Sequence, residues 1–138
     1  MNYEQARAYA VNVSRSGSIL GLDSIENLMH ELGDIQERLK IIHIAGTNGK
    51  GSTGAYLERV LIEAGYRVGR YSSPAVFDPM EVWRINLQSM SHEEYADIME
   101  QVKCACERME EKGMEHPTIF EVETAMAFLY FYQKKCDY

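Results

Sequence analysis

Seven consecutive residues of this sequence have the types and spacing to hold the phosphates of a nucleotide: Gly46-Thr-Asn-Gly-Lys-Gly-Ser52. Glycines let backbone N–H groups turn inward around an anion, and a helix that follows such a turn presents the positive end of its dipole. Lys50 could reach the outer phosphates, and a hydroxyl one turn into the helix, from Ser52 or Thr53, could bind Mg²⁺. The turn therefore predicts a phosphate-binding loop with Lys50 as its principal cation.

The loop matches the general pattern G-x-x-x-x-G-K-[ST] only in part. Gly49 and Lys50 stand in the expected places, but residue 51 is a glycine and the hydroxyl is displaced to Ser52. Ile44 stands where the pattern has its first glycine. The alternative to a phosphate-binding loop is a glycine-rich turn with a solvated lysine and no ligand-binding role. Three glycines, a lysine and a hydroxyl at a strand–helix junction favour an anion site instead.

The segments around the loop predict a strand–turn–helix–strand unit. Residues Ile41–Ala45 form a short β-branched run, which predicts a buried strand. An apolar pattern at helical spacing runs from the loop to Gly65, and Tyr66–Tyr71 predicts a second strand. Two strands joined in this way normally form a parallel pair with a right-handed crossover.

Helices account for most of the remaining chain. The pattern predicts a first helix over residues 3–13, and a second from Asp23 to Gly33 with Asp23 as its N-cap. A third, over 91–112, begins with a Ser91/Glu94 capping box, and a fourth, apolar helix covers 120–135. A short strand is expected near 82–87. Alternating helices and strands predict an α/β fold, and covering so many apolar helical faces calls for a third strand past Tyr138.

Composition narrows the class of protein. The 138 residues are 46% hydrophobic and carry a net charge of −7, which suits a globular domain and argues against a broad nucleic-acid surface. No run is long and apolar enough for a membrane span, and the first residues do not resemble a signal peptide, so a cytoplasmic location is expected. The three cysteines are interpreted as reduced thiols, because Cys104 and Cys106 are spaced too tightly for a usual zinc pair.

The wider stretch from His43 to Thr53 resembles the nucleotide loop of the folylpolyglutamate synthase/dihydrofolate synthase family, the folate branch of the Mur ligase superfamily. That loop reads GTNGKGS, so the displaced hydroxyl belongs to the family pattern. Further matches follow in family order along the chain: Gly21-Leu-Asp23, Glu63–Gly69, Tyr71-Ser-Ser-Pro74, Arg84-Ile-Asn86 and Thr118–Phe128. The resemblance implies a P-loop NTPase-like three-layer α/β fold with a parallel sheet, truncated after its first strands and helices. Residues 1–138 would be the N-terminal part of a Mur-ligase-type ATP-binding domain, with the rest of that domain and the C-terminal domain absent.

The resemblance also implies an activity and a set of site residues. ATP would phosphorylate the carboxylate of a folate or dihydropteroate, and the amine of L-glutamate would attack the acyl phosphate. Lys50 would be the catalytic cation, and Ser52 and Ser73 would ligate Mg²⁺. The nucleotide-binding residues would be Thr47, Asn48, Gly49, Lys50, Gly51, Ser52 and Thr53. The residues near the folate would be Gly21, Leu22, Thr118, Ile119, Phe120 and Glu121.

Several positions depart from the family pattern. Ala75 replaces a His or aromatic residue, and Arg84 is kept without the acid beside it, for which Glu81 is a candidate substitute. The family's next strand, with a glutamate that binds Mg²⁺, would follow Tyr138, so the chain alone is expected to lack full ligase activity. Two alternatives stay open: a P-loop ligase or kinase for another small carboxylate, and a non-catalytic module that binds an anion or a partner. Self-association through an exposed sheet edge is also expected.

Overall fold

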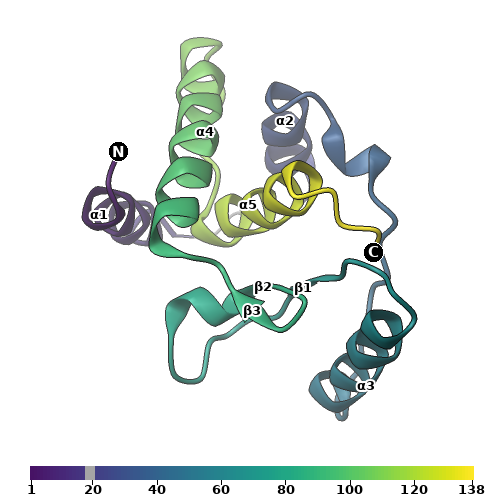
Figure 1. Ribbon diagram of the computed structural model, residues 1–138. Helices are drawn as coiled ribbons and strands as arrows, with labels where there is room; N and C mark the ends of the chain where they lie inside the picture. The colour runs from purple at the N-terminus through teal and green to yellow at the C-terminus, as the bar shows by residue number, and fades with distance from the viewer. Residues whose placement is uncertain (18–20) are drawn as a thin grey trace.

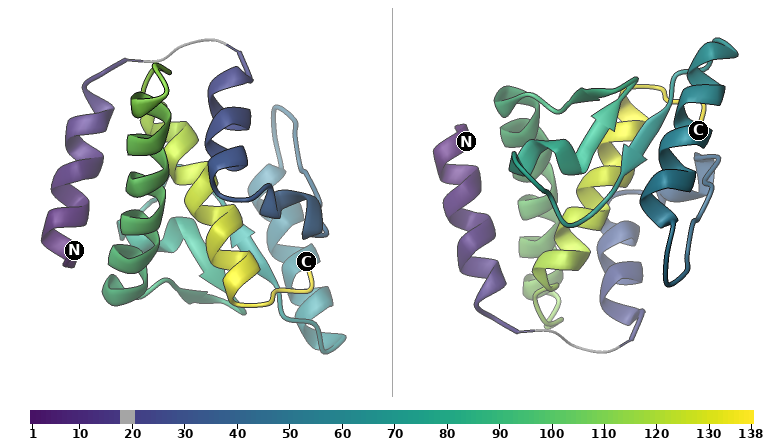
Figure 2. Two further views of the ribbon diagram at one scale, coloured as in Figure 1. Left: turned by 90° about the horizontal axis from the view of Figure 1, so that it is seen from above. Right: turned by 90° about the horizontal axis from the view of Figure 1, so that it is seen from below.

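Four helices pack around one apolar core in the computed structural model, which describes residues 1–17 and 21–138. They are α1 (Tyr3–Ser14), α2 (Asp23–Glu31), α4 (His92–Glu111) and α5 (Ile119–Gln133). The left view of Figure 2 shows α4 beside α1, and α5 between α4 and α2. The sequence predicted all four helices. No helix of the described ranges is long and apolar enough to cross a membrane.

Side-chain caps explain where most of these helices begin. The Ser91/Glu94 capping box opens α4 as predicted, and Asn2 with Gln5 opens α1 in the same way. The expected capping box at Asp23 is wrong, because α2 begins one residue earlier than predicted, with Leu22 as its N-cap and no side-chain cap. Asp23 lies in the first turn of α2 instead, where its charge favours the helix dipole. Part of the break expected between α1 and α2 lies outside the described residues.

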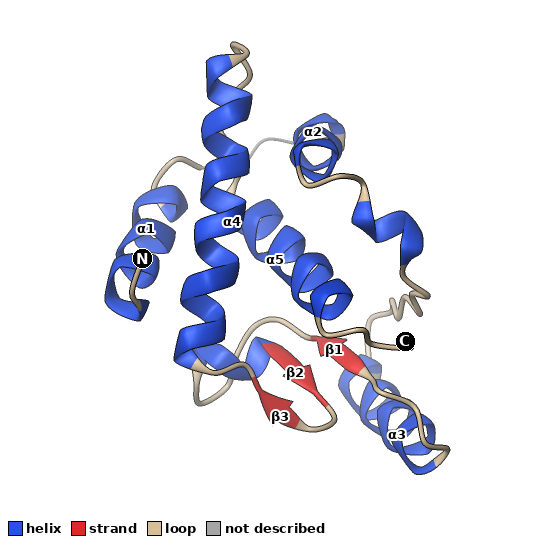
Figure 3. Cartoon of the chain, turned by 45° about the horizontal axis from the view of Figure 1, so that its top comes forward, coloured by secondary structure: helices blue, strands red, loops and turns tan. Residues whose placement is uncertain are grey.

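The sheet is small and antiparallel (Figure 3). It consists of β1 (Gly69–Tyr71), β2 (Trp83–Ile85) and β3 (Gln88–Ser89), in that order, with Arg70 of β1 opposite Arg84 of β2. The strand expected near 82–87 is therefore confirmed as β2, which follows a short 3₁₀ helix over Pro79–Val82. The α/β class is confirmed, but a parallel pair does not form among the described residues.

The predicted strand Ile41–Ala45 is not observed, and the reason lies at β1. The backbone of β1 pairs with β2, and the N–H of Gly69 donates to the carbonyl of Tyr138. Next to this bond, the N–H of Asp137 donates to the carbonyl of Arg67. Among the described residues, nothing then pairs with the 41–45 backbone, and Ile41 and the following Ile42 are exposed. A β-branched run alone does not make a strand when no neighbouring strand can pair with it.

Helix α3 (Lys50–Glu63) lies apart from the four-helix group, beside β1 (Figure 1). It ends as predicted, with Gly65 in the left-handed conformation at a φ of 92°. The glycine-rich loop precedes α3 directly and joins it to the 41–45 segment.

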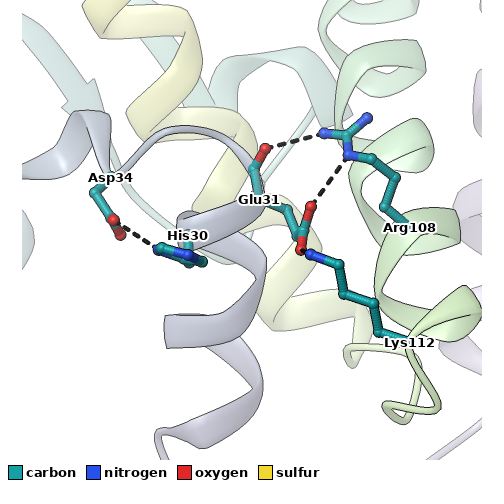
Figure 4. Close-up of polar contacts among 5 residues, drawn as sticks. All are labelled: His30, Glu31, Asp34, Arg108 and Lys112. Carbon is teal, nitrogen blue, oxygen red and sulfur yellow. Dashed lines mark hydrogen bonds and ion pairs between the residues drawn. The ribbon is translucent and has the colours of Figure 1, made fainter.

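Ion pairs join α2 to α4 on the opposite side of the molecule (Figure 4). Arg108 of α4 donates to a carboxylate oxygen of Glu31 at 3.2 Å and to the Glu31 carbonyl at 2.9 Å. Lys112 pairs with the same carboxylate. These cations also lie at the C-terminal end of α2, where positive charge stabilises a helix. Nearby, His30 and Asp34 form an i,i+4 contact of 2.9 Å.

Candidate functional site

The N-terminal end of α3 is open toward the solvent. Gly49 is its N-cap, in the left-handed conformation at a φ of 79°, and no side chain caps the helix. The N–H of Thr53 donates to the carbonyl of Gly49 at 2.9 Å, while the three N–H groups before it have no backbone acceptor in the described part of the chain. Free N–H groups at a helix start are the donors that an anion uses.

The first turn of α3 also lacks negative charge. The other four α-helices carry acidic residues in their first turns, and α1, α4 and α5 have capping boxes as well. Among the described α-helices, α3 alone has neither an acid nor a side-chain cap at its start. Its positive end is therefore not neutralised by its own sequence.

Lys50 folds back over the loop. Its ammonium donates a hydrogen bond to the carbonyl oxygen of Gly46, which closes the turn. The residues from Gly46 to Thr53 are all exposed. The loop is thus accessible from the solvent, and Lys50 bonds to the carbonyl at its first residue.

A cavity of about 790 Å³ lies between α3, β1 and α5 and brings part of the predicted site together. Lys50 and Gly51 line it from α3, Ser73 lines it after β1, and Phe120 lines it from the start of α5. Ser52 follows Gly51 directly but is not among the lining residues, nor are the remaining predicted nucleotide-binding residues Thr47, Asn48, Gly49 and Thr53. The lysine and one of the two proposed metal-binding serines therefore face the same space.

The predicted folate-binding residues divide into two groups. Thr118 and Glu121 are buried and form the capping box of α5, in which the Thr118 N–H donates to the Glu121 carboxylate at 2.8 Å. Phe120, which lies between them in the same turn, is 62% exposed and lines the cavity. Ile119, Gly21 and Leu22 do not line the cavity. A structural role is therefore visible for Thr118 and Glu121, and Phe120 is the member that a ligand could touch.

Glu81 organises the loop after Ser73. Its Oε1 accepts from the N–H groups of Val76 and Phe77, each at 2.6 Å, and of Asp78 at 3.2 Å. These bonds, led by the one from Phe77, hold the pKa of the Glu81 carboxyl below its ordinary value. The side chain of Phe77 is left 93% exposed. Glu81 thus shapes this loop, beyond the sequence-based expectation that it substitutes for a missing acid.

The polar residues of the cavity that sequence reasoning missed include Arg70, Glu58 and Thr124. Thr124 Oγ1 lies 3.4 Å from the hydroxyl of Tyr71, which stacks on Trp83. Burial raises the pKa of Tyr71. The only signal for Arg70 was a basic residue in a strand close to the loop.

The donors of the site fit a magnesium ion in part. Ser52 and Ser73 offer hydroxyl oxygens, the hard ligands that Mg²⁺ prefers, and this ion usually keeps several waters and phosphate oxygens. No group of three or more His, Cys, Asp or Glu side chains in the described ranges could form a separate metal centre. Residues present in the chain could therefore supply only part of a coordination shell.

Fold and site together define the chain as an α/β protein in which a glycine-rich turn opens an uncapped helix. The chain belongs to the folylpolyglutamate synthase/dihydrofolate synthase family. It is 38% identical over 129 residues to the dihydrofolate synthase/folylpolyglutamate synthase of Bacillus subtilis, covering 94% of this chain and 30% of that protein. It is 36% identical over 119 residues to the dihydrofolate synthetase of Saccharomyces cerevisiae, covering 86% and 27%. No family model matches the chain.

Solved structures agree with these relatives. The folylpolyglutamate synthase of Thermotoga maritima matches with a TM-score of 0.88 at 36% identity, over 98% of this chain and 31% of that one. A folylpolyglutamate synthase complex with AMPPCP and folate matches with a TM-score of 0.89 at 32% identity, over 99% of this chain and 34% of that one. A bifunctional enzyme with Mn, AMPPNP and L-glutamate bound matches at 0.83 and 33% identity, over 99% and 32%. The chain spans about a third of the length of the proteins it matches.

Proposed function

We propose that this chain supplies the phosphate-binding loop of an ATP-dependent ligase that joins L-glutamate to the carboxylate of a folate or dihydropteroate. The observation that carries the proposal is the uncapped, acid-free start of α3, with Lys50 and Ser73 facing one cavity. The relatives support it, since a similar structure was solved with AMPPCP and folate, and another with AMPPNP and L-glutamate. Residues 1–138 would then be part of a Mur-ligase-type ATP-binding domain.

The proposed reaction has two steps. A carboxylate oxygen of the folate attacks the γ-phosphorus of ATP, and ADP leaves with the electrons of the broken P–O bond. The glutamate amine then attacks the acyl carbon, an amide bond forms, and phosphate leaves as the amine loses a proton. Both steps need charge stabilised on phosphoryl oxygens, which is the task of Lys50 and of the N–H groups at the start of α3.

We assign Ser52 and Ser73 as the residues of this chain that would hold Mg²⁺. The ion would neutralise charge on the β- and γ-phosphates when bound. A manganese ion in a similar solved structure supports a divalent metal in the family. The residues from Thr47 to Thr53 would bind the phosphates, and Lys50 would stay with the γ-phosphoryl group during transfer.

At the other end of the cavity, Phe120 would contact the folate. It is the exposed member of the predicted set, and its ring suits an aromatic ligand. Thr118 and Glu121 would act by fixing the turn that presents Phe120. Gly21, Leu22 and Ile119 would lie at the periphery of the folate site.

Titration calorimetry with Mg·ATP tests the phosphate loop directly. We expect the chain to bind Mg·ATP and Lys50→Ala to weaken binding about tenfold or more, because a charge-assisted hydrogen bond to phosphate is lost. The same titration with ATP and EDTA measures the contribution of the metal.

Arg59→Ala is the matched control for that experiment. It removes a positive charge from the exposed surface of the same helix, where Arg59 pairs only with Glu63. Equal affinity of the parent and Lys50→Ala would contradict the proposal, as would equal losses in the two variants.

A further inference from the structure

A cluster of three charged side chains, one buried carboxylate and two partly buried arginines, lies behind the phosphate loop. Glu58 is 3% exposed and is the buried residue of α3. Its Oε1 accepts a hydrogen bond from Nη1 of Arg70 at 3.1 Å and lies 3.8 Å from Nη2 of Arg84. A buried carboxylate is costly unless cations pair with it, so the two arginines account for its position inside the molecule.

Arg70 reaches from this cluster to the loop. Its Nη2 donates to the carbonyl oxygen of Gly51 at 3.1 Å, the residue between Lys50 and Ser52. The guanidinium also lies against Gly54, where an added Cβ would be 3.3 Å from Nη2. Gly51, Gly54 and Glu58 are spaced by three and four residues, which places them on one face of a helix. One arginine of β1 therefore follows that face of α3 from its first turn to its third.

Apolar packing does little to hold α3 in place. Tyr56 and Val60 are exposed, and the remaining apolar side chains of the helix are at most partly buried. In the part of the chain that the structure describes, the polar contacts of Arg70 and the ion pair between Glu58 and Arg84 are thus the specific links between α3 and the sheet. The strand that carries Arg70 continues directly into Ser72 and Ser73.

We propose that Arg70, held by Glu58, is a positioning residue for the phosphate loop. The two donor nitrogens of its guanidinium hold the first turn of α3 at a fixed distance from Ser73. Lys50 and Ser52 lie in this turn and are positioned with it. Arg84, 3.8 Å from the same carboxylate oxygen, helps to hold the Glu58 side chain in place. This assignment rests on the proposed function in so far as the positioned groups bind a nucleotide.

Two variants, measured by Mg·ATP calorimetry, distinguish a positioning role of Arg70 from a contribution by its charge alone. Positioning predicts about tenfold weaker binding for Glu58→Gln, although this change removes a negative charge near an anion site. It also predicts weaker binding for Arg70→Lys, because an ammonium cannot reach both acceptors with the planar fork of arginine. If Arg70 contributed only charge, Glu58→Gln would bind more tightly and Arg70→Lys would bind as the parent does; either result overturns the proposal.

Amide hydrogen exchange of residues 53–58, whose N–H groups are hydrogen-bonded in the first turns of α3, gives a second readout without nucleotide. Faster exchange in Arg70→Lys than in the parent supports positioning, and unchanged exchange overturns it. Arg59→Gln, on the exposed side of the same helix, is expected to leave both readouts unchanged. Failure of the parent to bind Mg·ATP would count against the proposed function alone, since exchange still tests Arg70. If circular dichroism shows Glu58→Gln to be unfolded, Arg70→Lys carries the test because it keeps the charge.

Discussion

Gly69 is the residue at which β1 touches α5, and the contact depends on the absence of a side chain. A Cβ at this position would lie 2.5 Å from the ring of Phe131. Phe131 is itself buried in the core. Since β1 leads to Ser73 and carries Arg70, this single glycine sets how closely the sheet, and the residues on it, approach the helical group.

We expect Gly69→Ala to lower the free energy of unfolding by about 1–3 kcal/mol, because the ring of Phe131 or the strand must move. Urea unfolding followed by the fluorescence of Trp83, the single and buried tryptophan, measures the change. Gly51→Ala is the matched control, since a Cβ there meets nothing within 4 Å and alanine favours a helix. An unfolding midpoint of Gly69→Ala equal to that of the parent would contradict the packing described.

At the scale of elements, the joint between α2 and α4 depends on the charge of Glu31. The hydrogen bond from Lys112 is the main reason that the pKa of this carboxyl lies below its ordinary value of about 4.5, and Arg108 adds to it. A lowered pKa in the folded protein means that the ionised form favours folding. The stabilisation is present above the ordinary value and is lost as the pH falls through the lowered one.

Lys112→Met should therefore lower the urea midpoint near neutral pH and have a smaller effect in acid, once Glu31 is protonated. Urea titrations of parent and variant across pH 2.5–7, a range of roughly two units on either side of an ordinary carboxyl pKa, check this. Lys103→Met is the control on the same helix, because Lys103 pairs with Glu107 and lies over the ring of Tyr9, and neither contact involves Glu31. A difference between parent and Lys112→Met that stays constant with pH would show that Glu31 is not the group involved.

Local signals predicted the helices well and the strands poorly. The start of α4 followed from Ser91 and Glu94 because a capping box is complete within four residues. Asp23 misled because the same residue types also suit the first turn of a helix, and only the backbone decides between the two positions. Ile41–Ala45 misled because strand formation depends on a pairing partner that the run itself does not contain. The loop and Lys50 were predictable because, as in the capping box of α4, the whole pattern lies within a few consecutive residues. Arg70 was not predictable, because its partners lie 12 to 19 residues away in the sequence.

At the scale of the whole molecule, the exposed segment beside β1 makes self-association testable, and it stays a prediction. Ile42 is 49% exposed, in a segment whose backbone pairs with no other described residue. If a second copy pairs with this segment, the sedimentation coefficient should rise with concentration, and Ile42→Lys should abolish the rise, as lysines on natural edge strands prevent pairing. Val11→Lys, at a position 47% exposed on α1, is the control. A coefficient independent of concentration would contradict the prediction.

The bond from Lys50 to the Gly46 carbonyl has a consequence for selectivity. A ligand at the loop does not simply add to a free ammonium; it exchanges one acceptor for another. A carbonyl is a neutral acceptor, and a phosphate oxygen carries negative charge, so the exchange favours phosphate, while a neutral ligand gains nothing from it. The loop therefore discriminates by charge before any contact with the rest of the ligand discriminates by shape.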